Sequence, residues 1–236
     1  MNRRLPLAAL ATLAAGCAIV RPPARPAIAH YDFGLAPDEE GAGDPRIPAS
    51  LAVPEIQAPT WLDGRAMHYR MAYDEPARLR SYANSRWAAS PVSLLGDAVR
   101  GRLARATTEG ADVGRRRGSA QYLLRLEVEE LGQVFESPSS SRGVVRLRAI
   151  LLKRADRSVA GHHVFAASQP APTADAPGGV QALAAASRRI AGELVAWVAS
   201  RVESKGPEPS PEPTAGPTAV LEGVLPALGR APVARR

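Results

Sequence analysis

The stretch that decides the fold runs from Leu51 to Leu95. It reads Leu51-Ala-Val-Pro-Glu-Ile-Gln-Ala-Pro-Thr-Trp-Leu-Asp-Gly64, then Met67-His-Tyr-Arg-Met71, then Arg80-Ser-Tyr-Ala-Asn-Ser-Arg-Trp-Ala-Ala-Ser-Pro91. The prolines of the first piece favour a strand confined to a sheet edge or to short segments. Asp63-Gly64 predicts a tight hairpin turn, because glycine tolerates the positive φ that such turns need. Residues 67–71 and 82–87 predict two further strands, and Ser90-Pro91 predicts a helix N-cap followed by a first-turn proline.

The elements around this stretch follow from the periodicity of the apolar residues. Residues 31–34 predict a short strand and residues 37–50 a loop rich in Gly and Pro. Apolar positions at helical spacing predict one helix from Pro91 to just before Glu109 and another from Val180 to about Glu203. Alternating positions predict strands at 121–128, 145–151 and 159–167, with loops at 137–142 and 170–179. The sequence therefore predicts an α+β domain, in which two main helices pack on one face of an antiparallel sheet. The outer face of the sheet would carry solvent-exposed charged residues: Arg125, Glu127, Arg146 and Arg148.

The N-terminus has the pattern of an export signal. Arg3-Arg4 precede an apolar run from Leu5 to Leu13, which is far too short to span about 30 Å of hydrocarbon. The segment ends Leu13-Ala-Ala-Gly-Cys17, and Cys17 is the one cysteine of the chain, so no intramolecular disulfide can form. This pattern is typical of a lipobox and predicts a diacylglyceryl group on the Cys17 thiol. An ordinary signal peptide with an incidental cysteine is the alternative.

Composition divides the chain into four parts. We predict a signal peptide at 1–16, a lipidated tether at 17–29, a folded domain at 30–204 and a disordered proline-rich tail at 205–236. The tether contains Pro22-Pro23 and Pro26, which favour an extended chain of ~3.1 Å per residue. Within the tail, residues 219–225 form an apolar island. An incidental cluster explains that island better than a docking segment does.

The charge and the histidines argue against two function classes. The net charge of +7 and the sequence pI of about 10.3 suggest a protein that binds nucleic acid. However, only Lys153 and Lys205 are lysines, and the other basic residues are arginines. The dense basic run at 115–117 has no aromatic residues interleaved with it, so we expect no nucleic-acid partner. His162 and His163 are adjacent on a predicted strand and point to opposite faces, which prevents joint chelation. We expect no enzyme, no metal site and no cofactor beyond the covalent lipid on Cys17.

Several short motifs, in their order, resemble the ABC-type transport auxiliary lipoprotein family, the PqiC-like lipoproteins that accompany MCE-type lipid transport systems. These motifs are Ile56-Gln57-Ala58-Pro59, Trp61-Leu62-Asp63-Gly64, a Tyr-Arg pair, Tyr82, Ser85-Arg86-Trp87-Ala88 and Ser90-Pro91. The resemblance extends from Tyr31 to about Glu203. It implies a sheet flanked by two main helices and a role as a non-catalytic accessory component. It also implies an MCE-type partner and, through it, an ABC permease and ATPase.

The location and the contact residues complete these expectations. Ala18 follows Cys17 where an aspartate would signal inner-membrane retention, so we expect an outer-membrane lipoprotein that faces the periplasm. Trp61 and Leu62 lie beside the expected turn, near the surface, and are the predicted contacts for the MCE partner or for a second copy of the chain. Trp87, directly before the helix, is expected in the core. The alternative function is a structural lipoprotein that organises the envelope and binds a periplasmic polymer or partner.

Overall fold

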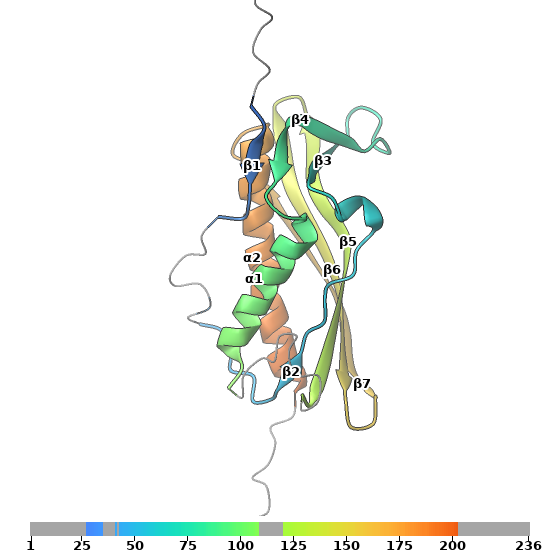
Figure 1. Ribbon diagram of the computed structural model, residues 1–236, viewed down its shortest axis with the longest axis vertical. Helices are drawn as coiled ribbons and strands as arrows, with labels where there is room; N and C mark the ends of the chain where they lie inside the picture. Colours follow the sequence, from blue (N-terminus) through green and yellow to red (C-terminus); the bar gives the residue numbers. More distant parts are fainter. Residues whose placement is uncertain (1–26, 35–40, 42, 109–119, 203–236) are drawn as a thin grey trace, which may run out of the picture. The chain divides into compact units, whose positions relative to one another are not determined.

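The computed structural model describes residues 27–34, 41, 43–108 and 120–202 (Figure 1). Within them a seven-stranded mixed sheet runs in the order β1-β4-β3-β5-β6-β7, with β2 paired to β5 beside this path. The elements are β1 Ala29–Tyr31, β2 Leu51–Ala52, the 3-10 turn η1 Thr60–Leu62, β3 Ala66–Met71, β4 Arg80–Trp87, α1 Pro91–Ala106, β5 Tyr122–Ser137, β6 Ser140–Lys153, β7 Val159–Pro170 and α2 Ala176–Arg201. The predicted signal peptide, Cys17, the basic run at 115–117 and the tail at 205–236 lie outside the described residues.

The predicted α+β class is confirmed, and both helices cover the same face of the sheet (Figure 1). Helix α2 packs on β5, β6 and β7, and α1 packs beside α2. The helix α1 begins as predicted: the Ser90 hydroxyl accepts the Ser93 backbone N–H at 3.1 Å, and Pro91 occupies the first turn. The predicted burial of Trp87 is also confirmed, since its side chain is 2% exposed.

The meander β5–β6–β7 is longer than the sequence predicts, and a bulge explains why. Val128 pairs with Leu147 and Glu130 with Arg146, so Glu129 is an extra residue on β5. Before the bulge the even-numbered residues face the helices; after it the odd-numbered Leu131 and Phe135 do. Because the buried positions change from even to odd numbers at the bulge, the alternation of apolar residues that indicates a strand is interrupted there. The expected loop at 137–142 is accordingly a tight turn, and β6 begins at Ser140.

The N-terminal half differs from the expected antiparallel arrangement. Strand β1 pairs in parallel with β4, and β2 and β3 pair in parallel with β5; β3 and β4 are antiparallel. The predicted hairpin turn at Asp63-Gly64 is wrong. The chain after β2 runs along β5 through a single bridge, Gln57 to Glu127, then winds into η1, and among the described glycines only Gly34 and Gly41 have positive φ. The sheet is therefore mixed.

Two polar junctions join the helices to the rest of the fold. The Arg102 guanidinium of α1 donates to both oxygens of Asp44 at 2.7 and 2.8 Å, and to the Arg188 carbonyl of α2 at 3.0 Å. At the other junction, the amide of the buried Gln133 accepts the Tyr82 hydroxyl at 2.9 Å and donates to Ser141 and to the Asp175 carbonyl. Burial raises the pKa of Tyr82 above its ordinary value, so this hydroxyl stays a donor.

A candidate partner-binding surface along strand β3

Trp61 lies on the sheet face that the helices leave uncovered. Its ring meets the His68 ring edge-on, with the centroids 5.6 Å apart. His68 stands between Met67, which is buried, and Tyr69, which packs on Phe135, so its side chain points to the opposite face. Trp61 is half-buried there. The His68 Nδ1 atom beneath it is buried and has no hydrogen-bond partner among the described residues.

Leu62 does not share this position, although it was predicted as a contact together with Trp61. Its side chain is 1% exposed and belongs to the core. The 3-10 turn causes the separation, because consecutive residues of a helical turn point in different directions. Of the predicted pair, Trp61 alone is accessible, and its role in binding stays a prediction.

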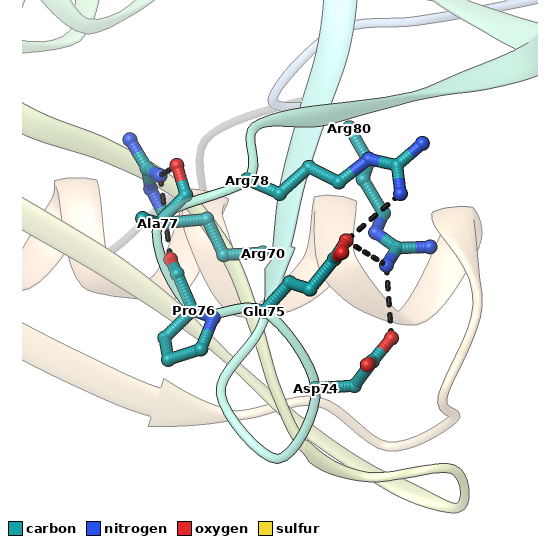
Figure 2. A network of polar contacts seen from close by, with 7 residues as sticks. All are labelled: Arg70, Asp74, Glu75, Pro76, Ala77, Arg78 and Arg80. Carbon is teal, nitrogen blue, oxygen red and sulfur yellow. Dashed lines mark hydrogen bonds and ion pairs between the residues drawn. The ribbon is translucent and has the colours of Figure 1, made fainter.

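The loop between β3 and β4 continues this surface and has a defined shape (Figure 2). The Glu75 carboxylate accepts from Arg78 at 2.8 Å and from Arg80 at 3.3 Å, and Arg80 also reaches Asp74 at 2.9 Å. From β3, Arg70 donates to the Ala77 carbonyl at 3.0 Å. The hydrogen bond from Arg78 and its positive charge lower the pKa of Glu75.

Exposed ion pairs of this kind stabilise a fold only slightly, so their main effect is to restrict the loop. Tyr73, in the turn that follows β3, is 44% exposed, and Arg70 lies near the end of β3. We call Trp61, His68, Arg70 and Tyr73 the β3 surface. The loop half of this surface was not predicted from the sequence, although the run Asp74-Glu75-Pro76 is typical of a turn.

An acidic hollow adjoins the β3 surface. Glu55, Asp63 and Glu127 line a depression of about 700 Å³ beneath the chain that leads into η1. Glu55 and Asp63 also line a neighbouring hollow, of about 390 Å³, that reaches Ser93 and Arg100 of α1. The carboxylates give this part of a positively charged protein a local negative potential.

Further along the uncovered face, the charges are paired differently from what the sequence suggests. Glu129, the bulge residue, accepts from Arg146 at 2.7 Å and from Arg148 at 2.7 Å. The hydrogen bonds from the two arginines lower the pKa of Glu129. The expected charged face is therefore present, with Glu129 as the acceptor where the sequence pointed to Glu127. These pairs are exposed and shape the surface more than they stabilise it.

The remaining chemistry of the described residues is sparse. They contain no group of three or more His, Cys, Asp or Glu side chains that could hold a metal ion. His162 and His163 lie on β7 as predicted, and the His163 ring stacks on Trp197 of α2 at 6.2 Å. No helix in the described part of the chain is both long and apolar enough to cross a membrane.

Comparison with known proteins adds a family and a fold. The family model of the ABC-type transport auxiliary lipoprotein component matches residues 31–195. A protein from Xanthomonas campestris, assigned to the DUF330 family model, superposes with a TM-score of 0.59 at 21% identity, covering 67% of this chain and 88% of that one. An uncharacterized protein superposes with a TM-score of 0.54 at 14% identity, covering 73% and 99%. At these identities the two structures establish the fold alone. No curated protein matches the chain.

Proposed function

The chain belongs to the ABC-type transport auxiliary lipoprotein component family, and on that basis we propose that it is the accessory, non-catalytic component of an ABC/MCE-type lipid transport system. Its direct partner is an MCE-type protein, which links it to an ABC permease and ATPase. The observation that carries the proposal is the family match, which spans the fold from β1 into α2. The lipobox pattern at Cys17 supports the membrane anchor.

The anchor determines where this protein works. One acyl chain gives marginal membrane binding, whereas several give stable anchoring at ~0.8 kcal/mol per buried methylene. The predicted tether at residues 17–29 is long enough to span up to ~40 Å at ~3.1 Å per residue. The folded body then operates close to the periplasmic side of the outer membrane. An MCE-type protein extending from the inner membrane meets it there.

We further propose that the partner docks on the β3 surface. Aromatic side chains dominate the binding energy of protein interfaces, and Trp61, which is half-buried, and Tyr73, which is exposed, supply two of them here. The ion pairs of Glu75 hold the loop in one shape before binding, which reduces the entropy that association costs. The adjoining carboxylates of Glu55 and Asp63 favour a partner segment with positive charge.

The test is affinity purification of the tagged, full-length chain from crosslinked cells. We expect the wild type to recover an MCE-type protein together with a permease and an ATPase. Trp61→Ala should reduce that recovery at least about tenfold, the effect of one hot-spot residue. Trp197→Ala is the matched control, because Trp197 is also half-buried but packs between α2 and β7.

Two results would contradict the proposal. Recovery of no transport component with the wild type would remove the accessory role, and co-sedimentation with a periplasmic polymer in its place would favour a structural envelope lipoprotein. Equal recovery with Trp61→Ala and wild type would leave the accessory role intact and show that the partner binds elsewhere.

A further inference from the structure

Strand β7 forms one edge of the sheet, beyond β6 (Figure 1). It runs for twelve residues, Val159–Pro170, whereas β1 at the opposite edge has three. In the described part of the chain, β6 is the only strand that pairs with β7, and α2 packs on its face. The far side of β7 therefore presents unpaired backbone groups to solvent.

The hydrogen-bond pattern identifies these groups. The Ala171 N–H donates to the Ser141 carbonyl at 2.9 Å, which makes these two residues a hydrogen-bonded pair of the antiparallel ladder. Every second pair is of this kind, so the odd-numbered residues of β7 bond to β6. The even-numbered residues direct their N–H and C=O groups away from it: His162, Val164, Ala166 and Ser168. Pro170 fits the same pattern, because a proline is tolerated where no ladder N–H is needed.

Between its irregular start and Pro170, strand β7 lacks the charges that usually protect an edge. Between Val159 and Pro170 it has no Asp, Glu, Lys or Arg, whereas its neighbour β6 carries Arg142, Arg146, Arg148 and Lys153. The one register shift lies at its start, and from Gly161 to Pro170 the ladder is regular. Native proteins interrupt long edge strands with charges, prolines or bulges, because an open edge is a template for another strand.

We propose that β7 pairs antiparallel with β7 of a second copy of this chain, about a two-fold axis near Phe165. Such an axis places Val164 opposite Ala166 of the other copy and His162 opposite Ser168, so no Asp, Glu, Lys or Arg side chain lies at these paired positions. Two copies of a chain with net charge +7 repel each other, and an uncharged strand is where they can approach. The two sheets then form one continuous sheet. The contact is isologous, and each β7 strand pairs its free edge with the other. The β3 surface stays accessible, so this contact is independent of the proposed transporter docking.

The test uses the full-length, lipidated chain in its own membrane with a single added cysteine. Val164→Cys is treated with a bismaleimide that spans about 10 Å, roughly two strand spacings. Glu127→Cys is the matched control, because Glu127, Arg148 and Val164 are register partners on one face across three strands. In the proposed dimer the two Glu127 positions are five strand spacings apart, about 24 Å, and out of reach.

Two copies with different tags, expressed together, identify the crosslinked species. We expect Val164→Cys to give a dimer that carries both tags, and Glu127→Cys to give none. Adding Ala166→Lys to Val164→Cys places a charge on each copy at the contact and should lower the dimer fraction at least about tenfold. Ala166 is exposed, so the melting temperature of the monomer should not change. No dimer, equal dimer from the control, a crosslink only to a different protein, or no effect of Ala166→Lys would each overturn the proposal.

Discussion

Trp87 lies where β1, β4 and the start of α1 meet. Its indole contacts the Phe33 ring edge-on at a centroid distance of 5.6 Å. The Trp87 N–H donates to the Arg65 carbonyl at 2.8 Å, and the Arg65 Nε donates to the Trp87 carbonyl at 3.0 Å. The next residue, Ala88, donates its N–H to the Tyr31 carbonyl at 2.7 Å. A single side chain thus fills the space that these three segments enclose.

We expect Trp87→Ala to lower the free energy of unfolding by ~3–5 kcal/mol, the cost of removing a large aromatic side chain from a core. Trp61→Ala removes the same atoms from a half-buried site and should cost less than half as much. Urea denaturation of the two variants and the wild type measures both values. Similar losses for the two variants would mean that Trp61 is as much a core residue as Trp87.

The burial of Trp87 could be predicted from the sequence, whereas the burial of Leu62 and the pairing of Glu129 could not. The difference is whether the determining signal is local. Trp87 closes a strand just before a helix cap, and both signals are local. The burial of Leu62 depends on a 3-10 turn that its own residue types do not mark. The role of Glu129 as the arginine acceptor depends on a bulge, which only the pairing of β5 with β6 defines. Side chains whose direction is set by a distant strand cannot be placed from local pattern.

At the scale of elements, helix α2 lies unusually close to β6. A Cβ atom built on Gly143 would lie 2.6 Å from the Leu183 backbone nitrogen and 2.7 Å from the Ala182 carbonyl carbon. Backbone atoms cannot move aside as a flexible side chain can. The absence of a side chain at Gly143 therefore sets the distance between the long helix and the sheet.

Gly143→Ala should destabilise the protein by ~1–3 kcal/mol or more, because the added methyl group forces α2 away from β6. Gly132→Ala is the matched control: Gly132 is on the adjacent strand, and its added Cβ would be 3.6 Å from the His68 carbonyl, an ordinary contact. Thermal unfolding of both variants by circular dichroism provides the comparison. A melting temperature for Gly143→Ala equal to that of the control would show that the helix shifts at no cost.

The start of α2 should make stability depend on pH. Hydrogen bonds from the Thr173 hydroxyl and the Gly178 N–H lower the pKa of the Asp175 carboxyl below its ordinary 3.8. A lowered pKa means that this stabilisation is present above about pH 4 and is lost as the pH falls through the folded-state pKa. Asp175→Ala should cost ~1 kcal/mol at pH 7, as for other N-caps, and progressively less in acid. Asp175→Asn, which keeps the acceptor without the charge, should show a weaker pH dependence; unfolding curves from pH 7 to 3 measure all three proteins.

Helices and the meander could be predicted, whereas the parallel strand pairs could not. The apolar spacing from Val92 to Ala106 and the alternation in β5 and β6 are local patterns, and they located these elements, although both strands are longer than predicted. β2 has two residues, and its pairing of Leu51 with Tyr122 depends on contact across the core. Likewise the β3 surface joins η1 to a loop that follows β3, so its composition became visible only once both were placed.

At the scale of the whole molecule, the anchor and the folded body should be separable. We expect Cys17→Ser to block lipid attachment and removal of the signal peptide, so that the chain no longer fractionates with outer membranes. Labelled palmitate and density-gradient fractionation measure the two effects, with Ala18→Ser as a control that keeps the thiol. Outer-membrane recovery and palmitate labelling equal to the wild type would refute the lipoprotein assignment of Cys17.

The parallel pairs of the N-terminal half have a consequence for biogenesis. Ala29 pairs with Ser85 and Leu51 with Tyr122, while β5, β6 and β7 pair with their neighbours in the chain. Contacts between distant residues form slowly, because closing a long loop costs more entropy. A chain exported N-terminus first, as its signal predicts, delivers β1 and β2 long before their partners emerge. Its first half then waits unfolded for the meander, and the speed of export relative to periplasmic proteolysis is expected to set the yield of mature protein.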